Sequence, residues 1–309
     1  MLDQNSVALD KATVLTTIFT IVDDVMKGSA VIQRALRRPG RAPHLSDSEV
    51  VTIALYQELI GEPREDHFFR LHRWSLLPFF PKLNERSRYN RRKRDMWSVI
   101  LAVRLSLQVV LDALEREAVG AVDSAPVPCV GRKRDKSHSD FVGVADYGVC
   151  SSKAMKYFGC KLHAVVSLAG VVLGYMLTSA APYDNQPLTE LLDSMPHRPK
   201  YLLGDGAYND EKLQDYLKQY SSLILLAPTR VNQQPKRTKE QQKTQNRLRL
   251  ICETVNAQLQ EQLHLSKHYA KSIWGFMTRV ATKLTAHSIG MMVNRMWGRP
   301  ALRLAELAV

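Results

Sequence analysis

Residues 118–228 alternate short apolar runs with helix-like segments, and this order constrains the fold more than any other feature. Three strand-like runs come first, AVDSAPVPCV, YFGCKLHAVVSLAG and VVLGYMLTSAA, and only Ala169-Gly170 separates the last two, which predicts a hairpin. A helix capped by Asp184 or Asn185, the strand YLLGDGAY, a second helix and the strand SLILLAP follow. The pattern predicts an α/β domain with a mixed five-stranded sheet flanked by helices.

The region before this sheet is expected to be all-helical. KATVLTTIFTIVDDVMK has apolar residues at a helical repeat, and HLSDSEVVTIALYQELIG has a Ser46 or Asp47 cap and stops at Gly61. We therefore predict two domains, residues 1–117 and residues 118–300, with a basic insertion in the second domain at about 229–246. That insertion is interpreted as a partly flexible linker, and a helix is expected to resume at Asn246.

The net charge of +13 and a pI of about 9.6 indicate a polyanionic partner, with nucleic acid the first candidate. A membrane surface is the competing partner, but the basic residues are spread over several segments, and no apolar run approaches the roughly 18 residues of a spanning helix. No signal-peptide pattern is found at the N-terminus. The four cysteines form no C-x-x-C pair and are interpreted as reduced thiols of a cytosolic protein, with a zinc site as the alternative.

A dense basic cluster precedes the long apolar segment that ends the helical region. It is interleaved with Tyr89 and consists of Arg86, Arg88, Arg91, Arg92, Lys93 and Arg94. The cluster is either a solvated helix start or a phosphate-binding surface. A helix start is a poor place for stacked positive charge because the macrodipole disfavours cations there, which favours contact with phosphates.

Three carboxylates stand at positions that a sheet and a packed helix can bring together. Asp123 lies in the first strand, Asp205 ends the fourth, and Glu253 lies on the helix after the fifth. Taken alone, Asp205 is interpreted as a turn former or a helix cap. Glu253 is flanked by Ile251 and Val255, so it is expected on the buried side of its helix with a cation as partner.

If the first and fourth strands are neighbours, Asp123 and Asp205 face each other across one gap, and the helix can present Glu253 to it. Carboxylates with open positions between them suit Mg²⁺ or Mn²⁺, which take the rest of their ligands from water and phosphate. Two such ions about 3.5–4 Å apart activate a water or a 3′-hydroxyl and stabilise the leaving oxygen of a phosphodiester.

The ordered set VDS, GDGAY and R-x-x-x-E-T resembles the DDE transposases of bacterial insertion sequences. The hairpin segment beginning GCKLH, together with LSDSEVVTIAL and RSRYNRRKR, resembles the same group. The resemblance covers nearly the whole chain and is strongest from about 119 to 262. It implies a ribonuclease H-like catalytic domain, related to retroviral integrase, behind a helical DNA-binding region.

The resemblance also implies roles for individual residues. Asp123, Asp205 and Glu253 match the catalytic, metal-binding Asp, Asp and Glu, and two Mg²⁺ or Mn²⁺ ions are expected. Arg249 matches an arginine that contacts DNA near the scissile phosphate. Many relatives also have a Tyr and a Lys where this chain has Asn246 and Gln260.

Several other residues have two interpretations. Lys161 and His163 share one face of a strand. They either lie at a strand edge that faces solvent or contact DNA near the first Asp. Asp146 is a possible further metal ligand, and residues 131–140 are interpreted as a loop that DNA orders. Trp274 and Trp297 are expected in the core. A nucleophilic role for Ser124 is disfavoured because residue order gives no Ser-His-Asp arrangement.

The sequence thus predicts a cytoplasmic, nucleoid-associated bacterial transposase that acts on double-stranded DNA as a homodimer, with no membrane partner. Two alternatives stay open. One is a ribonuclease H-like nuclease that cuts without joining. The other is a DNA-binding regulator in which the carboxylates only cap and pair.

Overall fold

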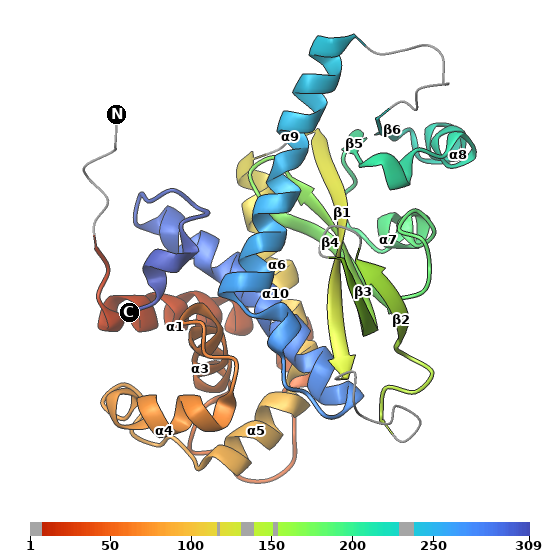
Figure 1. Ribbon diagram of the computed structural model, residues 1–309. Helices are drawn as coiled ribbons and strands as arrows, with labels where there is room; N and C mark the ends of the chain where they lie inside the picture. The colour runs from red at the N-terminus through yellow and green to blue at the C-terminus, as the bar shows by residue number, and fades with distance from the viewer. Residues whose placement is uncertain (1–7, 116–117, 131–138, 151–153, 229–237) are drawn as a thin grey trace. The chain divides into compact units, whose positions relative to one another are not determined.

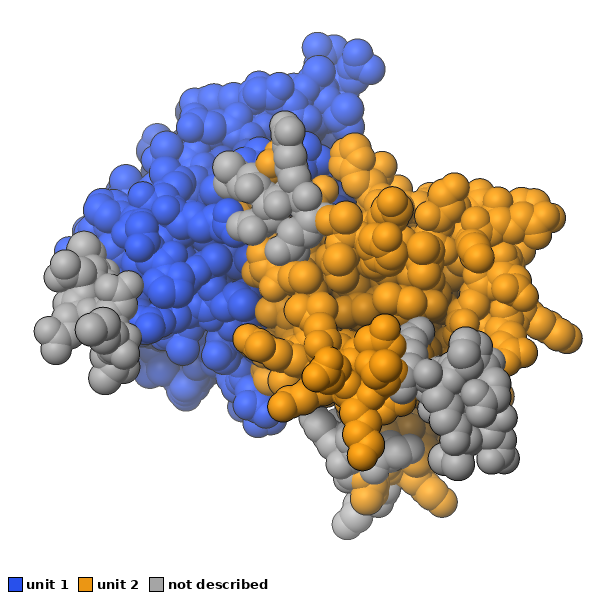
Figure 2. Space-filling model, turned by 90° about the horizontal axis from the view of Figure 1, so that it is seen from above, with its two compact units in different colours: residues 1–110, 258–309 blue, residues 111–257 orange. Residues whose placement is uncertain are grey.

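The computed structural model describes residues 8–115, 118–130, 139–150, 154–228 and 238–309 (Figure 1). The chain forms two compact units, coloured separately in Figure 2: unit 1 is Met1–Val110 with Gln258–Val309, and unit 2 is Leu111–Ala257. Both ends of the chain thus belong to unit 1. The functional domains predicted at 1–117 and 118–300 remain a prediction, because compactness alone does not assign a function to a segment.

Unit 1 is helical. Its helices are α1 Lys11–Gly28, α2 Ala30–Ala35, α3 Asp47–Leu59, α4 Glu65–Leu76, α5 Arg86–Asp95, the first part of α6 Trp97–Glu115, and α10 Ile273–Met296. The expected start of α3 is confirmed: Ser46 caps it in a capping box with Glu49, and Gly61 has a φ of +68° just after its end. Helix α3 packs on α1, α5 and α10, and almost all of its side chains are buried.

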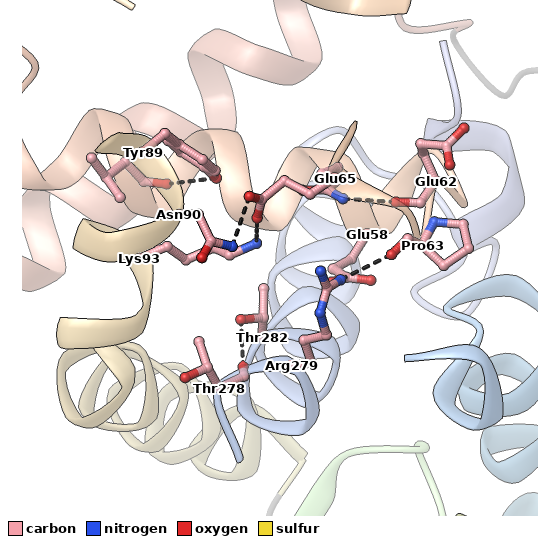
Figure 3. Close-up of polar contacts among 12 residues, drawn as sticks. Glu58, Glu62, Pro63, Glu65, Tyr89, Asn90, Lys93, Thr278, Arg279 and Thr282 are labelled. Atoms are coloured by element: carbon pink, nitrogen blue, oxygen red, sulfur yellow. Dashed lines mark hydrogen bonds and ion pairs between the residues drawn. The ribbon is translucent and has the colours of Figure 1, made fainter. Parts of the chain in front are cut away.

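Two lysines are buried in unit 1, each paired with a glutamate. Lys283 Nζ lies 2.5 Å from a carboxylate oxygen of Glu58, and Lys93 Nζ lies 2.5 Å from one of Glu65. Figure 3 shows Glu65 between Lys93 and Asn90, with both donating to its carboxylate. Pairing is what makes burial of such charges tolerable, because an isolated charge in the core is very costly.

The segment predicted as one long basic-to-apolar helix is two helices. α5 and α6 are bent by 62° about Met96, whose backbone N–H closes the last turn of α5. Within the described ranges no single helix is long and apolar enough to cross a membrane, and α5 with α6 meets that test of length and composition only as a bent pair.

Unit 2 contains the sheet. Its described strands are β1 Val119–Val130, β2 Asp146–Cys150, β3 Met155–Ser167, β4 Val172–Ser179, β5 Tyr201–Leu203 and β6 Ile224–Leu226. The order is β2-β3-β1-β5-β6, and β4 pairs with the part of β3 that β2 leaves free. β3 is antiparallel to β1, whereas β5 is parallel to both β1 and β6. The predicted mixed sheet is confirmed, with β2 as a strand that the sequence did not predict.

Among the described residues, the α-helices that lie wholly within unit 2 are α7 Leu188–Asp193, α8 Glu211–Ser221 and α9 Lys239–Ala257. α9 packs on β1, β3 and β5 (Figure 1). It begins at Lys239, before the expected Asn246, so part of the predicted basic insertion is helical. The expected cap of α7 by Asp184 or Asn185 is wrong, because Pro187 is the N-cap residue and makes no side-chain cap bond.

Candidate active site

The structure confirms that the first strand and the strand ending at Asp205 are neighbours. β1 and β5 pair in parallel, with Ala121 opposite Leu203. Asp123 lies two residues after Ala121, and Asp205 lies two residues after Leu203. The backbone of Asp205 is still extended. Continuing the same register therefore places the two carboxylates level with each other and on the same face of the sheet.

Asp123 is half-buried and bound by two donors. Its Oδ1 accepts from the backbone N–H of Ser124 at 2.8 Å, and its Oδ2 accepts from Nδ2 of Asn256 on α9 at 3.1 Å. Burial raises its pKa to about 6, and the charge of Asp205 adds to this effect, while the Ser124 N–H and Arg249 oppose it. A carboxylate whose charge is unfavourable without a cation is suited to bind one.

Asp205 also caps a turn. Its Oδ1 accepts from the backbone N–H of Ala207 at 2.9 Å and starts the short 3-10 helix Gly206–Tyr208. Gly204 just before it has no room for a side chain, since a Cβ there would lie 2.7 Å from the Cβ of Tyr208. The turn-capping interpretation and the paired-carboxylate interpretation of Asp205 are therefore compatible.

The GDGAY motif also contributes a buried hydroxyl beside the carboxylates. Tyr208 is buried, and within the described residues its hydroxyl has no hydrogen-bond partner. Burial raises the pKa of Tyr208, and the charges of Asp184, Asp123 and Asp205 raise it further. An unpartnered polar atom next to two carboxylates indicates a place where a polar group or ion can be accommodated.

The expected orientation of Glu253 is wrong. Its side chain is 52% exposed, because α9 turns Cys252 and Val255 toward the sheet instead. The expected cation partner is found: Arg249 Nη2 lies 2.9 Å from its carboxylate, one helical turn away. Arg249, expected to contact DNA, is therefore engaged by Glu253 in the protein alone.

The three predicted catalytic carboxylates are not gathered into a cage, although Asp123 and Asp205 come from neighbouring strands. Asn256 reaches Asp123 from one turn beyond Glu253, so this end of α9 lies over β1. In the part of the chain that is described, no three His, Cys, Asp or Glu side chains form a group able to hold a metal ion. The donors nevertheless fit a hard cation, because all are carboxylate oxygens with a buried hydroxyl beside them.

The strand register separates Lys161 and His163 from the first aspartate. Asp123 is paired with Ala164 and Ser124 with His163, so the side chains of Lys161 and His163 lie on the sheet face opposite to Asp123. β3 is also an interior strand, flanked by β1 on one side and by β2 and β4 on the other. The expectation of a solvent-facing strand edge is therefore wrong.

Both residues have internal partners. His163 is buried, its Nε2 lies 2.9 Å from the hydroxyl of Thr178, and burial lowers its pKa to about 4. Lys161 pairs with Asp184 at 2.8 Å and donates to the backbone oxygen of Pro182. Neither side chain is presented for contact with DNA near Asp123, and the strand register that decides this cannot be read from residue types alone.

The basic cluster of α5 divides into two faces. The exposed arginines are Arg86, Arg88, Arg91 and Arg94. Arg92 instead pairs with Asp47 at 2.5 Å, and Lys93 is buried against Glu65. The prediction that Lys93 contacts DNA is wrong, because its side chain is 3% exposed, whereas the exposed arginines remain candidates for phosphate binding.

The remaining predictions have mixed outcomes. Asp146 begins β2 and is exposed. Most of the predicted DNA-ordered loop, at 131–138, and the first half of the basic insertion, at 229–237, lie outside the described residues. Trp274 and Trp297 are not core residues, since they are 61% and 42% exposed.

Comparison with protein families gives the decisive match. Residues 115–289, more than half of the 309-residue chain, match a family described as transposase DDE domain. The chain belongs to the DDE transposase family. Comparisons with curated proteins and with solved structures returned no match. The protein is thus a transposase- or nuclease-type enzyme with a ribonuclease H-like fold, from a family whose substrate is DNA and which generally uses divalent metal ions.

The transposase site includes residues that sequence reasoning missed. Asn256 binds Asp123, and Tyr208 is buried beside both aspartates. The signal for Asn256 was its position three residues after Glu253, on the same side of the helix. The signal for Tyr208 was its place in GDGAY, where Gly204 leaves space for the tyrosine ring.

Proposed function

We propose that this transposase binds the ends of an insertion sequence and catalyses metal-dependent strand cleavage and strand transfer. Asp123 and Asp205 hold two Mg²⁺ or Mn²⁺ ions, and Glu253 binds one of them. The level placement of Asp123 and Asp205 on adjacent parallel strands carries the proposal, because it brings two hard oxygen donors to one point. The family match supports it independently.

The residues around the aspartates prepare the site. Asn256 and the Ser124 N–H fix the Asp123 carboxylate, and Asp205 is fixed by the turn that it caps. The ions supply an activated water for cleavage and an activated 3′-hydroxyl for joining. Glu253 would join the two aspartates in holding an ion, and Arg249, which now pairs with Glu253, would then be available to pair with a backbone phosphate.

DNA binding in this proposal uses the basic surplus. The exposed arginines of α5, with Arg88, Arg91 and Arg94 spaced by three residues, lie on one side of the helix and suit a run of phosphates. Joining two ends of an element needs two active sites, so the protein acts as a homodimer on double-stranded DNA, at the nucleoid in the bacterial cytoplasm.

The test is cleavage of an oligonucleotide carrying the element's end, with Mg²⁺ or Mn²⁺ and with chelator. Asp205→Asn keeps the size of the side chain and removes its charge. We expect cutting to require metal and to be lost in this variant while DNA binding persists. The matched control is Asp215→Asn, at an exposed position on α8, which should cut like the wild type.

The same assay separates the alternatives. A nuclease without joining activity would cut but never form strand-transfer products with a supplied 3′-hydroxyl end. A non-catalytic regulator would bind DNA without metal and would be indifferent to Glu253→Gln. Equal cutting by Asp205→Asn and wild type would show that Asp205 only caps its turn, and the proposal would fail.

A further inference from the structure

Unit 1 contains a cleft lined by aromatic and charged side chains. It has a volume of about 420 Å³ and is lined by Arg94, Asp95, Trp97 and Trp274. The two indole rings are in contact, with centroids 5.6 Å apart and planes inclined at 59°. A cleft of this size is within the range of about 300–1,000 Å³ that small ligands occupy.

The two tryptophans are held in place by the backbone around them. Trp97 begins α6 directly after the 62° bend, and Trp274 lies in the first turn of α10, which Ser272 caps through the N–H of Gly275. The Trp274 side chain is nonetheless 61% exposed. An indole that leaves most of its surface open is a surface on which another flat ring can stack.

The charges around the cleft select the kind of ring. Arg94 lines the cleft and continues the exposed arginine face of α5 through Arg91 and Arg88, which suits a chain of phosphates. Asp95 in the same cleft repels a free anion but accepts a hydrogen bond from a free N–H group of an unpaired base. Indole, guanidinium and carboxylate together match a nucleotide within a strand.

We propose that this cleft binds an unpaired nucleotide of single-stranded DNA, with the base stacked on Trp274 and the neighbouring phosphates on Arg94, Arg91 and Arg88. Stacking on an aromatic ring requires an unpaired base, since a paired base has both faces covered by its neighbours. The inference rests on the proposed function for its source of such DNA: once a strand is cut, the nucleotides at its free end can separate from the complementary strand.

The test measures binding of a fluorescein-labelled 12-nucleotide oligo-dT and of a duplex of the same length by fluorescence anisotropy. Because stacking contributes about 1–3 kcal/mol per base, Trp274→Ala should weaken oligo-dT binding about tenfold or more and change duplex binding little. Trp274→Phe keeps a stacking ring and should restore most of the affinity. Arg94→Ala should weaken binding of both DNA forms, because it removes a phosphate contact.

The matched control is Trp74→Ala in α4, which removes another exposed indole and should leave both affinities unchanged. Equal loss of oligo-dT binding in Trp74→Ala and Trp274→Ala would overturn the inference. So would a Trp274→Ala variant that changes only the oligomeric state, because the cleft would then hold a protein surface. A wild type that cuts duplex ends but does not bind oligo-dT overturns this inference and leaves the proposed function standing.

Discussion

At the scale of single residues, the environment of Asp123 explains why this position is suited to a cation. The carboxylate is half-buried, and burial raises its pKa from 3.8 to about 6. A raised pKa means that the folded state prefers the protonated form. Ionisation of Asp123 therefore costs folding free energy that builds up as the pH rises from the unfolded-state pKa of 3.8 to about 6 and is constant above it, and no such cost exists below the unfolded-state pKa.

Replacing Asp123 by Asn should stabilise the metal-free protein. The gain should be small at pH 4 and below, should grow as the pH rises from about 4 to about 6, and should level off above that at up to about 3 kcal/mol, since two pKa units correspond to that amount. Denaturant unfolding in chelator across this pH range measures it, while cleavage activity should be lost. An equal stability of both proteins at pH 8 would show that Asp123 bears no ionisation cost.

Asn256 is predicted to position Asp123. Residues that orient ligands typically contribute 10–100-fold to metal affinity or activity, so Asn256→Ala should lower Mn²⁺ affinity by about that factor. Binding is measured by Mn²⁺ titration in the absence of DNA. Thr254→Ala, two residues earlier and exposed, is the control and should bind the ion normally.

The candidate site was only partly predictable at this scale. The strand-end position of Asp205 and the neighbouring strands placed two carboxylates together, because parallel strands fix which ends meet. Glu253 was placed on the wrong side of α9 because Ile251 and Val255 flank it, but apolar neighbours two residues away do not determine which side of the helix faces the sheet. His163 and Lys161 were misplaced because strand pairing sets the face of a side chain, and a shift of one residue reverses it.

At the scale of elements, α5 has a structural face and an exposed basic face. Tyr89 and Lys93 point into unit 1, while Arg88, Arg91 and Arg94 point outward. The sequence showed one undivided cluster because Lys and Arg are ordinarily surface residues. The buried lysine became predictable only once a buried partner, Glu65, was known.

Variants on the two faces of α5 should change different properties, namely stability on the structural face and DNA binding on the exposed face. Lys93→Met leaves Glu65 buried without its cation and should lower the free energy of unfolding by about 3–5 kcal/mol. Arg91→Ala should change stability by less than about 0.5 kcal/mol but reduce the slope of log affinity for DNA against log salt by about 1. Denaturant unfolding measures the free energy of unfolding, and DNA binding at several salt concentrations measures the slope. A stable Lys93→Met variant that binds DNA poorly would reverse this assignment.

Some elements escaped prediction for local reasons. The strand β2 was not predicted, because VADYGVC is short and contains a glycine, and among the described strands β2 pairs only with β3. The break between α5 and α6 has no proline or glycine to mark it. The helix α3, by contrast, was predictable from its apolar content and its capping box.

At the scale of the whole molecule, unit 1 is formed by the N-terminal and the C-terminal parts of the chain together. α10 packs on α1, α3 and α5, and Lys283 of α10 forms the buried ion pair with Glu58 of α3. No sequence pattern predicts the pairing of α3 with α10, because Glu58 and Lys283 are 225 residues apart and each helix alone is only an apolar segment. Local patterns therefore predicted some helices of unit 1 but not which parts of the chain form this unit.

A fragment of residues 1–117 should consequently fail to fold by itself. It would leave Glu58 without its lysine, and the buried face of α3 would lose the helix that covers it. Joining residues 1–110 to residues 258–309 through a flexible Gly/Ser linker of about 20 residues should restore a cooperative thermal transition, followed by circular dichroism. The linked protein with Lys283→Met is the control and should melt at a lower temperature, because a buried carboxylate without its partner costs about 3–5 kcal/mol. A cooperative transition in residues 1–117 alone would show that the N-terminal helices form a core without α10, and that the division at residue 117 marks an independent folding domain.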